Sequence, residues 1–588
     1  MLSALSFKLI NGCYQNASSR NDSDVDFLLE ENVSWDDYGF RTSFFLHATK
    51  KLTKDKTIAL GAISIMDIDR AHDFNHVVLL TNQLEMGKIF SELPQNFCSL
   101  STSINLYKQL NRYLSPNQRR EFERSFHLIL DRESPYYQKV FNTECFNKSL
   151  LRDTNIDDYA LVFGKEKLRD TGCQYDLRSK GIKFKYESCD DEISLLFSPL
   201  RELENKESEV VFPNGIVAFI GKNGSGKSTL LYRLALELYT SANNRKMQIV
   251  PEDIVISQLI LFSYSPFDDF VLPNQSDVQL LKRWNKSFKN FKKTQNEAYK
   301  PRFIYCGIRD VEREVEELNN ALELEPDKPI LDGCGCYKDK NRLNKTFHQN
   351  MTKLSDECRI AFKAVYSLGG ENAADWTTFI RNLKEFAPEL KTDLKSLINN
   401  RDFYEKDWDE TFKKLSTGHK FFLHAMTHLI AYCEENAVIM FDEPENHLQA
   451  PLLSFMMKEM RRVLARRSSV MLVATHSPII LQETLSSNVR IVRRSGEKVF
   501  IQEPRIETFG ASFDSISSEV FDLTIDKVSY FDVIGKIYEQ ENCSTKESID
   551  DVLALMKNRM GKLSISAVHY IVQLYYSEKD GGVDVDIA

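Results

Sequence analysis

The stretch GIVAFIGKNGSGKST, residues 215–229, decides the fold of this chain. Its apolar start, 215–220, predicts a buried strand, and residues 227–238 have few breakers and predict a helix. Glycines between the two let the backbone fold tightly and turn its N–H groups toward phosphate oxygens. The spacing fits G-x-x-x-x-G-K-[ST], in which Lys227 reaches the β- and γ-phosphates and the Ser228 hydroxyl ligates Mg²⁺. We therefore predict a phosphate-binding loop, which also includes Gly221, Asn223, Gly224, Ser225, Gly226 and Thr229.

A second motif, VIMFDE, occupies residues 438–443. Its four apolar residues predict a buried strand, and the two carboxylates follow at the carboxyl end, where α/β sheets bind ligands. Asp442 is expected to hold Mg²⁺, directly or through water. Glu443 is placed to polarise the attacking water as a general base.

Two shorter motifs flank this strand: LSTGHK at 415–420 and ATHSP at 474–478. Ser416 and the Gly418 amide can donate to a γ-phosphate from the start of a helix. His476 can hydrogen-bond the γ-phosphate and report its presence. Alone, the first motif is a helix N-cap and the second holds a structural histidine. Their order along the chain favours the nucleotide-site interpretation.

The chain carries four motifs in the order GKNGSGKST, LSTGHK, VIMFDEPENHL and ATHSP. This series resembles the motifs of ABC-type ATPases in the branch of SMC, RecF and OLD proteins. The resemblance implies ATP and Mg²⁺ as ligands and a head-to-tail homodimer, in which the signature of one protomer covers the ATP of the other. Glu445, Asn446 and His447 match the D-loop at that seam. Thr417 replaces a glycine of many family members, and His419 a glutamine of transporters.

The implied fold is α/β: an ABC-ATPase head with a mostly parallel sheet, an antiparallel N-terminal β region, a helical insertion and a helical C-terminal tail. The expected units are 1–195, the N-terminal part of the head with an α/β insertion; 196–270, the first core part; 271–410, a helical lobe; 411–505, the second core part; and 506–588, a helical C-terminal region. A lid contact is expected at 265–269, where a predicted strand ends; Gln258 lies within that strand.

Two further segments, 36–42 and 507–512, resemble the PtuA family, the ATPases of Septu anti-phage pairs that also occur as retron-associated effector subunits. This resemblance implies an ATPase that converts ATP and water to ADP and phosphate, gates an HNH-type nuclease subunit and is not itself a nuclease. In a retron setting, a reverse transcriptase with its RNA/DNA product, or another nucleic acid, would be a further partner.

The composition of the chain bears on its possible partners and on its compartment. The formal net charge of −9 argues against a chain coated with basic residues for nucleic acid. Lys8 interrupts the apolar start, and no apolar run approaches the roughly 18 residues of a membrane span, so no membrane contact is expected. Eleven scattered cysteines suit a reducing cytoplasm. The acidic stretch 21–37 predicts a solvated loop.

Four further local patterns give weaker signals. The basic, aromatic-interleaved stretch 282–302 can track phosphates and stack bases, or form a solvated helix whose aromatics face the core. The arginines of 461–467 predict a surface or partner-facing role. Cys334 and Cys336 form a C-x-C pair without a second pair, and 584–586 is too close to the chain end for a Toprim site.

Three other function classes compete with this hypothesis. A transporter motor would place its signature much closer to the P-loop lysine than Ser416 lies to Lys227. An OLD-type nuclease needs an acidic, glycine-flanked strand pattern that the residues after His476 lack. An SMC- or RecF-like repair ATPase stays open, although 271–410 shows no sustained heptads for a long coiled coil.

Overall fold

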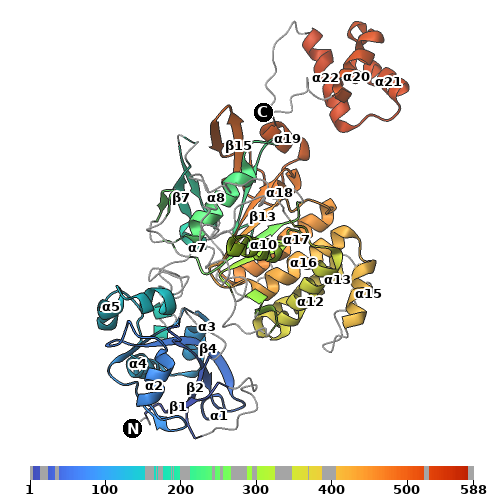
Figure 1. Ribbon diagram of the computed structural model, residues 1–588. Coiled ribbons are helices and arrows are strands. Elements are labelled where there is room, and N and C mark those ends of the chain that lie inside the picture. The colour runs from blue at the N-terminus through green and yellow to red at the C-terminus, as the bar shows by residue number, and fades with distance from the viewer. Residues whose placement is uncertain are drawn as a thin grey trace.

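The computed structural model contains three bodies: an N-terminal body, a central head with a helical lobe, and a small C-terminal helical body (Figure 1). The structure describes residues 4–12, 24–32, 39–102, 104–151, 164–166, 168–169, 177–186, 189, 191–198, 212–240, 245–251, 254, 256–265, 288–289, 291–293, 301–324, 347–367, 370–386, 405–521 and 529–579. The predicted C-x-C pair, the 584–586 tail and residues 36–38 of one PtuA-like segment lie outside these ranges.

The N-terminal body is built on a six-stranded sheet of order β5-β1-β2-β3-β4-β6. Only β1 and β2 pair in parallel; the other neighbours are antiparallel. Helices pack against this sheet around a large, aromatic-rich core, and a second cluster that includes Met66, Cys98 and Phe146 is buried separately. The elements are β1 (Phe7–Ile10), β2 (Phe27–Glu31), β3 (Ser43–Ala48), α1 (Lys50–Thr53), β4 (Ile58–Asp67), α2 (His76–Gln83), β5 (Ile89–Phe90), β6 (Phe97–Leu100), α3 (Ile104–Tyr113), α4 (Pro116–Ser125), α5 (Pro135–Val140) and η2 (Phe146–Leu150).

The prediction of a solvated loop at 21–37 is wrong for its centre, because β2 is buried. Two acidic residues are buried with it, and each has a partner. The Asp26 carboxylate accepts hydrogen bonds from the Ser6 hydroxyl at 2.6 Å and from Lys51 Nζ at 3.0 Å. Glu30 lies 2.8 Å from His47 Nε2. Buried charges persist when they are paired in this way.

The head is organised around a seven-stranded sheet of order β12-β11-β13-β14-β9-β15-β16. Neighbours from β12 to β15 are parallel, and β16 closes an antiparallel hairpin with β15. The mostly parallel α/β head predicted from the motifs is therefore confirmed. The strands are β9 (Ile216–Ile220), β11 (Leu259–Ser263), β12 (Phe303–Gly307), β13 (Val438–Asp442), β14 (Val470–Thr475), β15 (Val489–Ser495) and β16 (Lys498–Gln502).

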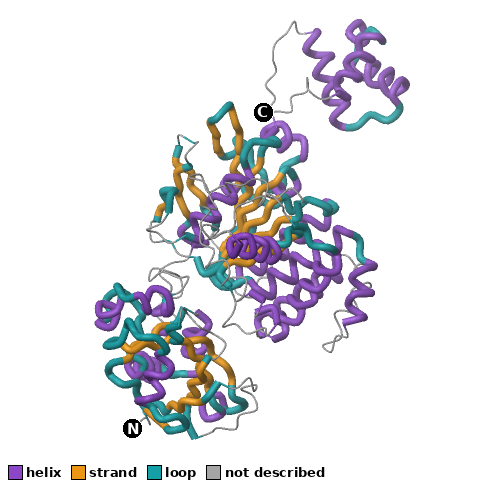
Figure 2. The backbone as a smooth tube through the Cα atoms, in the orientation of Figure 1, coloured by secondary structure: helices purple, strands orange, loops and turns teal. Residues whose placement is uncertain are grey.

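The first four residues of β13 are apolar because both faces of the strand are buried. Ile439 and Phe441 point into the cluster on one face of the sheet, and Val438 and Met440 into the cluster on the other. Figure 2 shows the helices of the lobe packed along one side of the strands. A strand buried on both faces reads as a continuous apolar run.

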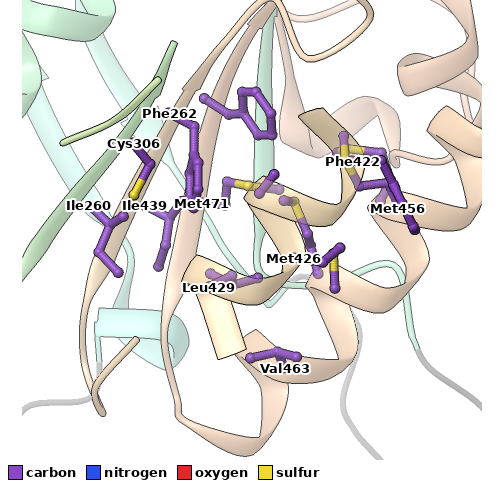
Figure 3. Packing of buried hydrophobic residues seen from close by; sticks show 14 of the residues in the cluster. Ile260, Phe262, Cys306, Phe422, Met426, Leu429, Ile439, Met456, Val463 and Met471 are labelled. Atoms are coloured by element: carbon purple, nitrogen blue, oxygen red, sulfur yellow. The ribbon is translucent and has the colours of Figure 1, made fainter. Parts of the chain in front are cut away.

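On one face of the sheet lie α8 (Lys227–Tyr239) and a small antiparallel sheet, β10-β7-β8. On the other lies the helical lobe, where Phe422 and Met426 of α16 pack between the sheet and Met456 of α17 (Figure 3). The elements are α7 (Leu177–Lys180), β7 (Ile182–Lys185), β8 (Glu192–Leu195), β10 (Ile249–Val250), α10 (Val311–Leu324), α12 (Met351–Ser367), α13 (Gly370–Phe386), α15 (Glu405–Lys414), α16 (Thr417–Tyr432), α17 (Ala450–Arg466), α18 (Pro478–Gln482) and η5 (Ser486–Asn488).

Two of the units expected from the sequence do not coincide with the bodies that the structure shows. The unit 1–195 spans the N-terminal body and also β7 and β8, which share a core with the head. The lobe 271–410 contains, besides its helices, the edge strand β12, which pairs with β11 along its whole length. The lobe is therefore not purely helical.

The arginines of α17 do not form a partner-facing surface, so that prediction is wrong. Arg462, Arg466 and Arg467 all bond the carboxylate of Asp375, which is 2% exposed. Arg461 is buried and donates to the carbonyl of Glu483. Only Arg466 keeps a half-exposed side chain. These arginines fasten α17 to α13 and to the end of α18.

The described part of the basic stretch also packs inward. Phe288 and Phe291 are buried in the lobe core, and Lys292 pairs with Glu312 and Glu357. This favours the solvated-helix alternative for these residues. The remainder of 282–302, apart from 301–302 and the described residues of 288–293, lies outside the described ranges.

The C-terminal body has its own core, formed by three helices. Its elements are α20 (Ser529–Gln540), η7 (Cys543–Thr545), α21 (Ile549–Met560) and α22 (Ile565–Lys579), and α19 (Phe513–Phe521) precedes it against the head. Across the described ranges of the whole chain, no helix combines the length and the apolar character that crossing a bilayer requires.

Candidate functional site

The phosphate-binding loop connects β9 to α8, as its sequence predicts. Gly224 and Gly226 adopt φ values of 75° and 94°, which glycine reaches without strain. A Cβ on Gly221 would lie 2.1 Å from the Val492 carbonyl oxygen, so this position requires glycine for space. A Cβ on Gly224 or Gly226 would meet nothing within 4 Å, so the loop faces open space.

Lys227 lies at the first turn of α8 with its ammonium group folded over the loop. Its Nζ donates to the carbonyl oxygens of Gly221 at 3.0 Å and Lys222 at 3.2 Å. Burial lowers the pKa of Lys227 to about 8, and the carboxylates of Glu443 and Asp442 offset part of that effect. The lysine is therefore a partly desolvated cation beside the loop, suited to a phosphate.

Asp442 ends β13 beside the start of α8. Its carboxylate accepts the Ser228 hydroxyl at 2.9 Å on one oxygen and the Tyr232 hydroxyl at 2.7 Å on the other. Burial raises the pKa of Asp442, while the hydrogen bonds from Tyr232 and Ser228 lower it in part. Ser228 and Asp442 thus present adjacent oxygen ligands of the kind that Mg²⁺ prefers.

Glu443 occupies an unusual backbone conformation, with φ at 49°. Its carboxylate accepts Asn446 Nδ2 at 3.0 Å on one oxygen and lies 3.1 Å from His476 Nε2 on the other. The hydrogen bond from His476 is the main reason that the pKa of Glu443 is lowered. Non-glycine residues with positive φ cost of order 1–3 kcal/mol and cluster at functional sites.

Glu445, in the segment expected to be the D-loop, bonds within its own chain. Its carboxylate accepts the Thr475 hydroxyl at 2.9 Å and the His476 backbone N–H at 2.5 Å. Burial raises the pKa of Glu445. This carboxylate fixes the end of β14 and thereby the position of His476.

The start of α16, expected to be the signature motif, lies against the segment expected to be the D-loop. Ser416 is exposed and caps α16 by accepting the His419 N–H at 3.2 Å. A Cβ on Gly418 would lie 2.2 Å from the His447 carbonyl oxygen, and the Phe421 and His447 rings are 5.1 Å apart. Glycine at 418 therefore permits close contact between the signature helix and the segment that follows Glu443.

Only part of the segment predicted to form the lid, 265–269, lies within the described residues. Ser263, the last residue of β11, pairs in register with Asp442, so the chain after it leaves the sheet beside the site. Ser265 follows, and 266–269 lie outside the described residues. Gln258 lies at the opposite end of β11, where its Nε2 donates to the Pro301 carbonyl at 3.5 Å.

A protein family described as "AAA domain, putative AbiEii toxin, Type IV TA system" matches residues 337–482, which include the signature, Asp442, Glu443 and His476. Residues 337–482 are therefore similar to an AAA-type ATPase domain. The match begins after the phosphate-binding loop, which the structure joins to the matched region through β9 and β14.

Comparison with individual proteins finds further similarities. Protein ea59 of Escherichia phage lambda is 24% identical over 565 residues, covering 93% of this chain and 95% of ea59. Ribosome protection protein VmlR of Bacillus subtilis (strain 168) is 27% identical over 105 residues, 18% of each chain. A solved SMC head bound to the C-terminal winged-helix domain of ScpA aligns at 11% identity and a TM-score of 0.24, over 57% of this chain and 98% of that one. A metal-chelate-type ABC transporter in an inward-facing conformation aligns at 12% identity and a TM-score of 0.24, over 58% and 89%.

The structure brings together the side chains of Lys227, Ser228, Asp442, Glu443 and His476 from separate elements of the ATPase domain. Ser416 and Gly418 lie at the start of α16, beside the D-loop. Gly221, Asn223, Gly224, Ser225, Gly226 and Thr229 form the loop and the first turn of α8.

Sequence reasoning missed Tyr232, which bonds Asp442 directly. A signal for it existed, because residue 232 lies four positions after Ser228 and therefore on the same face of α8.

Proposed function

We propose that this chain binds ATP with Mg²⁺, closes as a head-to-tail homodimer around two ATP molecules, and hydrolyses ATP to ADP and phosphate. In this proposal, closure and hydrolysis gate a partner effector, an HNH-type nuclease subunit, in anti-phage defence of the Septu or retron type. The observation that carries the enzymatic part is the Glu443 carboxylate, held between Asn446 and His476 next to the Ser228–Asp442 pair.

The residues present fit Mg²⁺ and a nucleotide phosphate. Ser228 and Asp442 supply oxygen ligands within 2.9 Å of each other. The Ser225 hydroxyl in the loop is buried and has no hydrogen-bond partner among the described residues. A bound Mg²⁺ would neutralise phosphate charge as the γ-phosphate leaves. The protein's part is to hold its ligands in place, which Tyr232 does for Asp442.

Glu443 is suited to act as the general base. Its lowered pKa keeps the carboxylate ionised at neutral pH, ready to accept a proton from water. His476 and Asn446 each hold one carboxylate oxygen, so the carboxylate has one fixed orientation. His476 is then positioned to respond to the γ-phosphate and to transmit that response to Glu443.

The signature supports a composite site. Ser416 is exposed at the N-terminus of α16, a helix start that favours an anion. Its hydroxyl is engaged only in capping its own helix in the contacts described above. We assign Ser416 and Gly418 to the ATP held by the partner protomer, as the motif resemblance implies.

Two comparisons support the effector role. The matching family carries the name of a toxin in a type IV TA system, which favours an ATPase domain coupled to an effector. The likeness to ea59 spans nearly the full chain, so the N-terminal and C-terminal bodies belong to one shared architecture with the head. We propose the lobe and residues 506–588 as docking surfaces for the nuclease.

Glu443→Gln tests the enzymatic proposal, because glutamine keeps the shape but cannot accept a proton. We expect it to bind ATP, fail to turn it over, and form an ATP-dependent dimer in size-exclusion chromatography with light scattering. Glu443→Gln combined with Ser416→Arg should bind ATP equally but remain monomeric. A Glu443→Gln protein that stays monomeric with saturating ATP and Mg²⁺ would contradict the composite site.

A further inference from the structure

The lobe contains a cluster of three buried side chains that the nucleotide site does not use. Glu357 comes from α12, and His424 and His428 from α16. One donor atom from each lies within 4.8 Å of the other two. Exposure is 8% for Glu357, 0% for His424 and 4% for His428. Within the described part of the chain, this is the one group of three or more His, Cys, Asp or Glu side chains that converge so closely.

We propose that Glu357, His424 and His428 bind a Zn²⁺ ion that joins α12 to the signature helix α16. The two histidines are four residues apart on one helix, so their rings lie on the same face, and they stack with centroids 3.9 Å apart. A pair of imidazoles with one carboxylate is a ligand set that zinc accepts, with a fourth position open to water. Mg²⁺ and Ca²⁺ prefer all-oxygen sites.

The hydrogen bonds of the histidines leave ring nitrogens available for a metal. Nδ1 of His428 lies 2.8 Å from the His424 carbonyl oxygen, which only accepts, so this Nδ1 carries the proton and Nε2 carries the lone pair. Nδ1 of His424 is engaged by the Tyr264 hydroxyl at 2.9 Å. Metal-bound histidines commonly hold their second nitrogen in this way.

His424 Nε2 is buried and has no hydrogen-bond partner among the described residues. It faces Glu357 Oε2 at 3.8 Å, too far for a hydrogen bond. Two ligand atoms of a tetrahedral zinc lie about 3.4 Å apart at bond lengths of about 2.1 Å. A side-chain adjustment of a few tenths of an ångström would therefore let one ion contact both atoms.

Charges around the cluster are compatible with a cation. Glu357 uses its other oxygen, Oε1, to bind Lys292 at 2.7 Å, which leaves Oε2 for the metal. Glu312 also pairs with Lys292, so two carboxylates face one ammonium group. Burial lowers the pKa of both histidines, which keeps them neutral, the form that binds metal. Burial opposes ionisation of Glu357, but Lys292 and His424 still lower its pKa.

The position of the ion gives it a structural role. His424 lies two turns after Ser416, and Tyr264 lies at the start of the segment expected to be the lid. The zinc would hold the signature helix, α12 and the lid end of β11 in one rigid unit. The inference does not depend on the proposed ATPase cycle.

The test measures metal in the full chain, purified without a polyhistidine tag. Elemental analysis by mass spectrometry should find about one zinc per chain in the wild type. His428→Gln and Glu357→Gln should each lose most of it, while His569→Gln, an exposed histidine of the C-terminal body, should retain it. Circular dichroism establishes that each variant is folded.

Cobalt gives a second readout that does not depend on activity. Chelated wild-type protein reloaded with Co²⁺ should develop visible d–d absorption typical of tetrahedral coordination, and His428→Gln should not. Wild type that holds no zinc and shows no such band with added Co²⁺ would overturn the proposal. So would zinc that persists at equal stoichiometry in both cluster variants.

Discussion

Removing the Tyr232 hydroxyl in Tyr232→Phe should weaken Mg²⁺ binding, because this hydroxyl holds one oxygen of the Asp442 carboxylate. The hydroxyl donates to Asp442 at 2.7 Å, and Asp442 is 6% exposed. A hydrogen bond to a charged group contributes about 1.5–3 kcal/mol. Its loss in Tyr232→Phe should raise the pKa of Asp442 further, because the hydrogen bond from Tyr232 lowers that pKa.

The effect of Tyr232→Phe can also be estimated from the expected loss of Mg²⁺ affinity. Loss of a side chain that orients a metal ligand typically costs about 10–100-fold in metal affinity. The two routes agree, so we expect the Mg²⁺ concentration for half-maximal ATP turnover to rise by about 10–100-fold. Burial already raises the pKa of Asp442, and protonation competes with the metal, so the defect should grow as pH falls.

The assay is a Mg²⁺ titration of steady-state ATP hydrolysis at saturating ATP, repeated at pH 6 and pH 8. Tyr239→Phe, on the same helix, is the control, because its ring packs on Phe303 and lies beside Arg302, away from Asp442. An unchanged Mg²⁺ dependence in Tyr232→Phe, or an equal shift in Tyr239→Phe, would refute the reasoning.

Since Lys227 has a pKa of about 8, ATP affinity measured by calorimetry should fall by up to about tenfold per pH unit above that value, and Lys227→Arg should abolish this slope. Gly418→Ala should reduce ATP turnover, because its methyl group would lie 2.2 Å from the His447 oxygen and overpacking costs about 1–3 kcal/mol; Gly535→Ala, which meets only Tyr570 at 3.5 Å, should not. The chain alone should not cut plasmid DNA with Mg²⁺ or Mn²⁺, with or without ATP; cleavage that survives re-purification, with Glu443→Gln as a control preparation, would revive the OLD-type nuclease hypothesis.

The parallel core was predictable because its strands carry strong local signals. The run before Gly221 and the run ending at Asp442 are wholly apolar, and each is followed by residues with a required chemistry. Strand β12, at 303–307, was missed because it lies in a polar, mainly helical region and pairs with a strand distant in sequence. Such long-range pairing decides strand identity more than local propensity does.

Polar residues were harder to place than apolar ones. Arg467 is indistinguishable in sequence from a surface arginine, yet it is buried against Asp375, 92 positions away. Glu30 lies in an acidic run but is buried beside His47. In both cases burial depends on polar partners elsewhere in the chain, and a lone sequence does not identify those partners.

Complementation between two inactive variants tests the composite site most directly. Lys227→Ala should not bind ATP, and Ser416→Arg should bind ATP without closing over the partner's nucleotide. In a head-to-tail dimer, a mixed pair contains one intact site, formed by the Lys227 of one protomer and the Ser416 of the other. Equal mixing should therefore restore about a quarter of wild-type turnover, since half of the dimers are mixed and each has one working site. A mixture no more active than either variant alone would contradict the account.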